Sequence, residues 1–357
     1  MRYYELAVSD SGGGQNYLLD PSGLGFAKGS GPLASSLYTS QTTKNSQLIG
    51  KTNPNALNIE FDMPVYPGHI PQGQALIRLW GVGLKTLGQA SNLNPVNGAF
   101  KTFTLKGGMS KGLPLANPAQ SGLLAQGIIW QAFGNWQGTN QTLDIIVQPG
   151  EPPGNQGVAV SFTWKKGSNL QGAVSQMLAQ AFPDYTPKIN IGQSLTAPID
   201  QVGCYRDINA FFQYLNAYTK NLGTQQYGAD YHGVSFSFVG NTIQVTDGKG
   251  QAAARSVALN FQDLVGQPTW IDVNTVLFPT VLRGDINWGD QVTFPTGILP
   301  PYALTTPAAA YPNSPAASSS AFKGKFVVRE VHHYANFREP DAASWNTTFT
   351  ALYLPGA

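Results

Sequence analysis

Charged side chains are scarce in this sequence. Asp, Glu, Lys and Arg together make up 11% of its 357 residues, whereas soluble domains contain roughly 25%. A surface with so little charge lacks the usual protection against association. A monomer with a surface of Ser, Thr, Asn and Gln would account for this composition. We favour a subunit whose surface is largely covered by neighbouring chains, because the centres of protein interfaces are depleted in charge.

Cysteine, basic clusters and long apolar runs are also lacking. Cys204 is the single cysteine, which excludes an internal disulfide bond and a cysteine-based zinc site. The longest basic run is Lys165 and Lys166, and the formal net charge is +2, so no surface for nucleic acid or anionic lipid is indicated. No apolar run approaches the roughly 18 residues of a membrane span, and the start, MRYYELAVSDS, lacks the apolar core of a signal peptide. We therefore expect no membrane anchor.

Glycine and proline are abundant instead, with 40 Gly and 25 Pro, and they divide the chain into short segments. Six stretches in residues 1–150 predict strands, because they are rich in β-branched and aromatic residues and bounded by Gly, Pro or Asn. They are MRYYELAV, ALNIEFDMPV, QALIRLWGV, KTFTLKGGM, LLAQGIIWQAF and QTLDIIVQPG. The polar stretch 9–52 is too long for a tight turn and is predicted as a long loop.

From residue 158 the pattern becomes a mixture of helix and strand. VAVSFTWKKGSNLQGAVSQMLAQAF predicts a strand and then a helix. Ser168 is the expected N-cap, with Gln171 at the third position of a capping box, and Pro183 is expected to end the helix. The apolar face of this helix consists of Val174, Met177, Leu178, Ala181 and Phe182.

A second helix is predicted in RDINAFFQYLNAYTKNLG, with Asp207 as its cap and Gly223 at its end. Its apolar stripe consists of Ile208, Phe211, Phe212, Leu215 and Leu222. A hairpin follows in GVSFSFVGNTIQVTDG, with Gly240 and Asn241 at the turn. The middle of the chain is therefore predicted to be α+β.

The chain returns to a β pattern at about residue 257. TVLFPTVLRGDINWGDQVTFP predicts strand, turn and strand, and Gly284 in the turn is expected to adopt a positive φ. Residues 300–321 are rich in Pro, Ala and Ser and contain no charge, which predicts an extended loop. FKGKFVVREVHHYANF and SWNTTFTALYL are the two closing strands.

Two patterns resemble hydrolase sites. GMSKG, from Gly108 to Gly112, matches the G-x-S-x-G of a nucleophile elbow, which requires a helix directly after the serine. Two prolines follow in LPLANPAQ, so a glycine-rich turn is the better interpretation. Glu60 and Asp62 share one face of a predicted strand, but nothing marks either as the acid of a catalytic pair across a cleft.

The adjacent His332 and His333 in FVVREVHHYANFRE suggest a metal site at first sight. Successive side chains of a strand point to opposite faces, so the two imidazoles cannot bind one ion from a regular strand. His69 and His232 have no spacing that would bring them to either. We therefore predict no catalytic, cofactor-binding or metal-binding residue and no enzymatic activity. His332 is expected to be a structural hydrogen-bonding residue, with Glu330 as its nearest candidate partner.

The C-terminal motifs carry a family resemblance. VLRGDINWGDQVTF contains G-D-I-x-x-G-D, KGKFVVREVHHY contains G-x-F-x-V-x-x-V-x-H, and a tryptophan precedes a Thr-rich last strand. The matching positions are Gly284, Asp285, Ile286, Gly289 and Asp290, then Gly324, Phe326, Val328, Val331 and His332, then Trp345, Thr347 and Thr348. This segment resembles the end of the baseplate hub proteins of contractile-tailed bacteriophages, of the Mu-like and late-control-D-like type. ALIRLWGVG, FTLKGGM, GLLAQGIIWQAF and the helix-bearing middle extend the similarity in order along the chain. Loops 9–52 and 300–321 are longer than the family pattern.

The resemblance implies a mainly β fold. Two related β-barrel domains, over residues 1–157 and 257–357, would flank a small α+β domain over 158–256. It implies a structural virion protein, a homotrimer that forms a pseudo-sixfold ring. The ring would join the sixfold tail tube, or a tube-initiator ring, to the threefold central spike and form part of the DNA channel. The tape measure protein and other baseplate proteins would be further partners. The expected location is the tail baseplate, after synthesis in the host cytoplasm.

Three alternatives remain open. The aromatic content, including Trp130, Trp136 and Trp164, would suit a receptor- or carbohydrate-binding tail protein. Another ring-forming tail protein, such as a distal tail or tube-initiator subunit, would form a hexamer. A cell-wall hydrolase would depend on Glu60 or Asp62.

Overall fold

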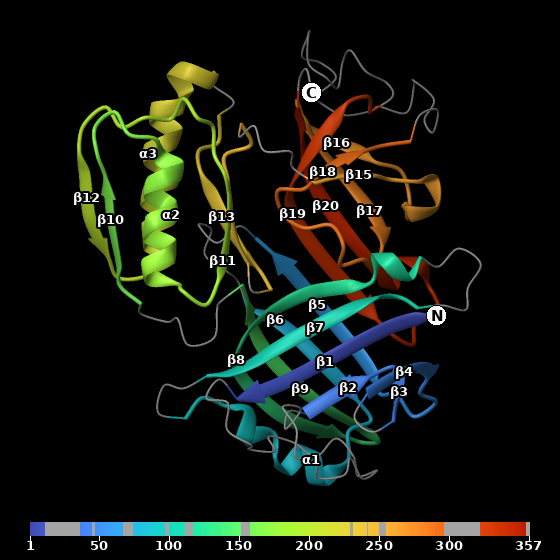
Figure 1. Ribbon diagram of the computed structural model, residues 1–357. Coiled ribbons are helices and arrows are strands. Elements are labelled where there is room, and N and C mark those ends of the chain that lie inside the picture. Colours follow the sequence, from blue (N-terminus) through green and yellow to red (C-terminus); the bar gives the residue numbers. More distant parts are fainter. Residues whose placement is uncertain are drawn as a thin grey trace.

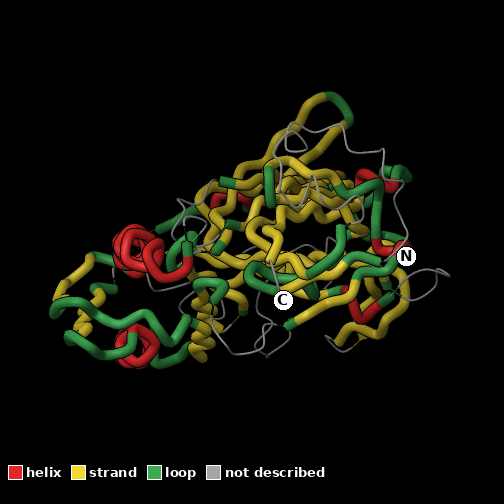
Figure 2. Tube along the Cα trace, turned by 90° about the horizontal axis from the view of Figure 1, so that it is seen from above, coloured by secondary structure: helices red, strands yellow, loops and turns green. Residues whose placement is uncertain are grey.

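The computed structural model describes residues 1–10, 36–44, 47–66, 74–96, 100–110, 117–150, 158–228, 231–240, 242–249, 255–295 and 322–354. Strands dominate, and they form a long curled sheet with a smaller helix-containing unit beside it (Figures 1 and 2). The described residues form three buried apolar clusters, drawn mainly from the N-terminal, middle and C-terminal segments. The loop predicted over 300–321 lies outside the described residues.

The N-terminal segment confirms all six predicted strands. They are β1 (Arg2–Asp10), β5 (Asn58–Val65), β6 (Ala75–Trp80), β7 (Lys101–Met109), β8 (Gly122–Gln137) and β9 (Asn140–Pro149). Buried and outward-facing side chains alternate along these strands. In β6 the core-facing Ile77 and Leu79 are fully buried, whereas Arg78 between them points outward.

The stretch 9–52 was predicted as a loop, but its described part contains three short strands. They are β2 (Ser36–Thr39), β3 (Gln41–Lys44) and β4 (Gln47–Thr52). The prediction was wrong there because Tyr38 lies opposite Leu6 of β1 and is buried in the first apolar cluster. Residues 11–35 lie outside the described part of the chain.

The C-terminal segment confirms the predicted strand, turn and strand and the two closing strands. Its strands are β15 (Ser256–Ala258), β16 (Thr269–Asp272), β17 (Thr275–Val281), β18 (Gln291–Thr293), β19 (Lys325–Asn336) and β20 (Trp345–Leu354). In β17 and β20 every second residue is buried. Val276, Phe278, Phe349 and Ala351 of these strands belong to the third apolar cluster, in which Phe278 stacks on Phe349 at 5.2 Å.

One sheet of thirteen strands unites the two β segments. Its order is β16-β17-β20-β19-β5-β6-β9-β8-β7-β1-β2, and β15 and β18 attach at the side of β19. The join is the antiparallel pair β19 and β5, in which Ala335 lies opposite Phe61. Ala335 and Trp345 consequently belong to the first apolar cluster, although both come from the end of the chain. The N-terminal strands β1, β2 and β5–β9 and the C-terminal strands β15–β20 form the two β layers of this sheet, which are thus joined edge to edge.

The middle unit places two helices between two small sheets (Figure 1). Its elements are β10 (Val160–Trp164), α2 (Leu170–Ala181), β11 (Thr186–Asn190), β12 (Gln201–Tyr205), α3 (Ile208–Tyr227), β13 (Ser235–Val239) and β14 (Thr242–Thr246). β10 pairs with β12, and β11 pairs with the hairpin β13–β14. The predicted hairpin is confirmed with Gly240 at a φ of 60°, and Asn241 lies outside the described residues.

The start of α2 corrects one prediction. Asn169, not Ser168, is the N-cap: its side-chain oxygen accepts a hydrogen bond from the Gln171 backbone N–H at 2.6 Å. The Ser168 hydroxyl donates to the Lys165 carbonyl instead. The expected stop is confirmed, because the helix ends at Ala181, two residues before Pro183.

The end of α3 corrects a second prediction, which placed Gly223 at the end of the helix. Asp207 caps the helix as predicted and accepts from the Ala210 N–H at 2.7 Å. Gly223 does not end it, since the helix continues to Tyr227 and Gly228 follows at a φ of 93°. Gly223 instead makes room for a ring: a Cβ there would lie 2.3 Å from Tyr231. No helix in the described ranges is long and apolar enough to span a membrane.

Candidate functional site

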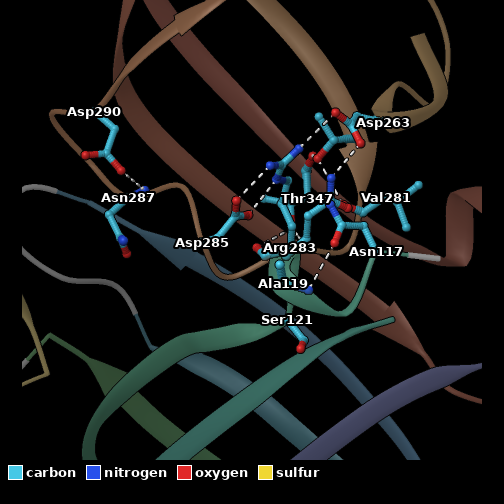
Figure 3. Close-up of polar contacts among 12 residues, drawn as sticks. Asn117, Ala119, Ser121, Asp263, Val281, Arg283, Asp285, Asn287, Asp290 and Thr347 are labelled. Atoms are coloured by element: carbon cyan, nitrogen blue, oxygen red, sulfur yellow. Dashed lines mark hydrogen bonds and ion pairs between the residues drawn. The ribbon is translucent and has the colours of Figure 1, made fainter. Parts of the chain in front are cut away.

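The turn after β17 contains a buried arginine held by two carboxylates (Figure 3). The Arg283 side chain donates through Nε and Nη2 to the two carboxylate oxygens of Asp285, at 2.7 and 2.8 Å. Its Nη1 lies 3.5 Å from Asp263 on the other side. Arg283 is 2% exposed. A buried guanidinium is stable only when it is paired and hydrogen-bonded, so this geometry fixes the shape of the turn.

Gly284 brings the same turn onto the N-terminal strands. Its N–H donates to the Gln120 carbonyl at 2.9 Å, and the Gln120 side chain donates to Asp263 at 2.6 Å. A Cβ on Gly284 would lie 2.6 Å from the backbone of Gly122. The predicted positive φ was wrong: the positive φ in this segment belongs to Gly289, at 83°. Glycine is needed at 284 because two backbones approach closely there.

A line of hydrogen bonds runs from this turn through the sheet. The Arg283 N–H donates to the Thr347 hydroxyl at 3.1 Å, and Thr347 Oγ1 lies 2.9 Å from His333 Nδ1. His333 also hydrogen-bonds the backbone of Leu124 on β8, and burial lowers its pKa to about 3. The imidazole is therefore neutral, and it lies between the backbone of Leu124 and the Thr347 hydroxyl, which also donates to the Arg283 carbonyl at 3.3 Å. His333 thus connects the two β layers.

His332 lies on the opposite face, as strand alternation predicted. Its imidazole Nε2 contacts the carboxylate of Asp62 on β5, and both side chains are exposed. The predicted partner, Glu330, was wrong because the pairing of β19 with β5 brings Asp62 closer. Among the described residues no group of three or more His, Cys, Asp or Glu side chains could hold a metal ion. His69 lies outside them, and His232 lies in the middle unit.

The hydrolase candidates are also separated by the fold. Glu60 accepts a hydrogen bond from the Trp80 indole at 3.2 Å, so Glu60 and Asp62 share a face, as predicted, but have different partners. The Ser110 hydroxyl donates to the Met1 carbonyl at 3.2 Å. The segment after Ser110 that a nucleophile elbow would require to be helical, residues 111–116, lies outside the described residues.

All three parts of the chain meet beside His333. A small cavity of about 40 Å³ there is lined by residues of β8, β13, β19 and the turn before β18, among them Leu124, Phe238, Trp288 and His333. The Gln126 side chain donates to the carbonyl of Gly240 at 2.7 Å and so attaches the middle hairpin to β8. This junction connects the three parts of the chain.

No protein-family model and no curated protein sequence matches the chain. Solved structures do resemble it. The 43 kDa tail protein of prophage MuSo2 from Shewanella oneidensis has 6% identity and a TM-score of 0.46, with 98% of this chain and 96% of that chain covered.

Two further structures are similar. The E. coli c3393 protein, described as a type VI secretion component similar to bacteriophage T4 tail proteins, has 10% identity, a TM-score of 0.44 and coverage of 84% and 74%. A tail protein from Neisseria meningitidis has 9% identity, a TM-score of 0.39 and coverage of 84% and 92%. With TM-scores below one half, these likenesses assign no activity or partner.

Proposed function

We propose that this chain is a structural tail protein that assembles as a trimeric baseplate hub. The observation that carries the proposal is the pairing of β19 with β5, which joins two β layers edge to edge in one subunit. If each layer forms one segment of a ring wall, three subunits supply six segments. Such a ring matches a sixfold tail tube on one side and a threefold spike on the other.

The contacts between the two layers hold them rigidly together, as the wall of a ring requires. Trp345 of β20 is 2% exposed, and its indole donates to the Gly108 carbonyl of β7 at 3.0 Å. Its ring also meets Phe61 of β5 edge to face, with centroids 6.3 Å apart. Because side chains of one layer fill the core of the other, neither can rotate without opening an apolar core. This rigidity supports a structural role.

The charge pattern suits a channel for DNA in transit. The formal net charge is +2 and the longest basic run has two residues. A wall rich in Lys and Arg would hold phosphates and slow passage. In the proposed hub the remaining partners are the tail tube or tube-initiator ring, the central spike and the tape measure protein, all in the virion.

Oligomeric state tests this proposal. Light scattering on the purified chain, followed by image averaging of the particles, should give a trimer with six wall segments around a central channel. A hexamer would favour a tube-initiator ring. A chain that stays monomeric at all concentrations would contradict both.

A second candidate function has one observation in its favour. A surface recess of about 320 Å³ is lined by Arg78, Trp80, Asn135, Gln137, Asn140 and Thr142. An aromatic ring surrounded by amide and hydroxyl groups can bind a neutral saccharide by stacking and hydrogen bonding. Binding on a glycan array that disappears with Trp80→Ala would support a carbohydrate-binding tail protein. An array without hits would remove this alternative.

A further inference from the structure

We infer that the outer half of the β8–β9 hairpin is an assembly arm, residues 130–142, which docks on the edge segment 261–272 of another copy of this chain. This inference rests on the proposed ring and names the surfaces that would close it. Three properties of the arm support it: its free edge, its exposed aromatic side chains and its lack of charge.

The arm extends beyond the strand that flanks β8. β7 pairs with β8 only as far as Lys101 opposite Ile129, so residues 130–137 have β9 as their single strand neighbour within the described ranges. One backbone donor on the open side, the Ala132 N–H, is satisfied by the Asn94 side chain at 2.6 Å. The segments α1 (Leu84–Gly88) and η1 (Ala90–Leu93) pack against the first part of this half of β8. The strand edge is therefore open beyond Gly134, where it is a template for pairing with another chain.

Aromatic side chains of the arm are exposed on both of its faces. Phe133 is 41% exposed and lies opposite Asp144, on the outward face of the sheet. Trp136 is 63% exposed and points to the other face, which it shares with the buried Ala132. The Trp136 indole donates to the Gly138 carbonyl at 2.7 Å, so its polar group is already satisfied. Exposed aromatic rings on both faces of a hairpin fit contact with a partner better than a free surface position.

The arm carries no charged side chain. The entire run 112–143, which contains it, has no Asp, Glu, Lys, Arg or His. Exposed edges are normally protected from pairing by charges, proline or bulges. A bulge lies at the base of the arm, between Ile129 and Gln131, but the arm beyond it has neither charge nor proline. An uncharged arm is best covered by a surface of low charge, which favours a second copy of this chain: charged residues make up 11% of the sequence, and segment 261–272 has one exposed charge, Asp272.

The edge segment 261–272 is the matching surface. It runs along β17 and forms one end of the thirteen-stranded sheet. Phe261 is 69% and Ile271 is 52% exposed, and β16 has no strand on its outer side among the described residues. β16 lies seven strands away from β8 in the sheet order, so the two surfaces are distant in the sheet. A contact between two different surfaces of identical chains closes a ring when the rotation allows it.

Substitutions on the arm test the contact. Phe133→Gln/Trp136→Gln should raise the dissociation constant of the assembly by ~100-fold or more, since aromatic anchors are typical hot spots. The matched control is Ile199→Gln/Val202→Gln, at apolar residues of the middle unit that are 60% and 77% exposed. It should change the constant by no more than about twofold. Sedimentation gives the constants, and thermal melting checks that each variant is folded.

The possible results of this experiment distinguish the proposed arm contact from the proposed trimeric hub. A trimer that survives the arm substitutions overturns the arm contact and leaves the proposed hub intact. A dimer or larger ring that dissociates with them supports the arm contact and overturns the trimer. A wild-type chain that remains monomeric overturns both.

Cross-linking tests the receiving edge with the aromatic anchors left in place. In a Cys204→Ser background, one population carries Gln137→Cys and the other Thr269→Cys, both at exposed positions. A short bis-maleimide should give a covalent dimer in the mixture and none in either population alone. A trimer that forms without this product would overturn segment 261–272 as the docking surface.

Discussion

Thr347 Oγ1 lies 2.9 Å from His333 Nδ1, in the interior between β20 and β19. Burial is the main reason that the pKa of His333 falls to about 3, and the neighbouring His332 lowers it further. The imidazole therefore stays neutral in the folded chain at every pH above about 3. In the unfolded chain the same group takes up a proton below its ordinary value of about 6.5.

This difference predicts a pH dependence of stability. Because the unfolded state binds the extra proton, the free energy of unfolding should decrease as pH falls from 6.5 toward 3, and this contribution should be constant above 6.5. The slope from His333 approaches about 1.4 kcal/mol per pH unit. Urea unfolding at pH 7.5, 6.0 and 5.0 measures it.

The matched variant is His333→Gln, which has no titratable group at this position. It should be less stable than wild type at pH 7.5, and the difference should shrink at pH 5.0. Asp290, whose pKa is raised by burial, is present in both proteins and cancels in the comparison. Equal pH slopes for the two proteins would contradict a neutral, buried His333.

Gly284→Ala should destabilise the chain by about 2–4 kcal/mol, because the new Cβ meets the backbone of Gly122 at 2.6 Å and neither segment can move freely. Gly172→Ala is the control. It lies within α2 with nothing inside 4 Å of its Cβ position, and helix propensity predicts a gain of about 0.5–1 kcal/mol. Denaturant midpoints measure both. If Gly284→Ala left the free energy of unfolding unchanged, the turn would not be in close contact with β8.

Arg283→Met should cost about 3–5 kcal/mol, since it leaves the buried Asp263 without its cation and removes the two parallel hydrogen bonds to Asp285, which keeps only Arg255 at 3.8 Å. Arg283→Lys should recover part of this loss, because an ammonium keeps the charge but not the two parallel hydrogen bonds. Arg206→Met is the control. Arg206 pairs with Asp207 at 2.8 Å, but its side chain is 87% exposed, so the change should stay below about 1 kcal/mol. Equal losses at the two arginines would argue against a buried network.

Local sequence patterns predicted the strands and helices well. They could not predict contacts between strands that are distant in the sequence. Alternation correctly placed His332 and His333 on opposite faces. It could not identify Asp62 as the partner of His332, because that contact joins residues 270 positions apart and depends on the pairing of β19 with β5. The same limit applies to glycine. Gly284 and Gly223 read as turn and stop signals, but backbone and ring contacts from remote segments require them.

The shared core predicts that both β layers unfold together. Trp345 comes from the last strand, yet it fills the first apolar cluster and bonds Gly108. Trp345→Ala should therefore cost about 3–5 kcal/mol and increase hydrogen exchange in β7 as well as in β20. Phe212→Ala is the control, since Phe212 lies in the apolar cluster of the middle unit. It should increase exchange in α3 first. If Trp345→Ala loosened β20 while β7 kept its protection, the layers would be separate units, and the rigid wall on which the proposed hub depends would not exist.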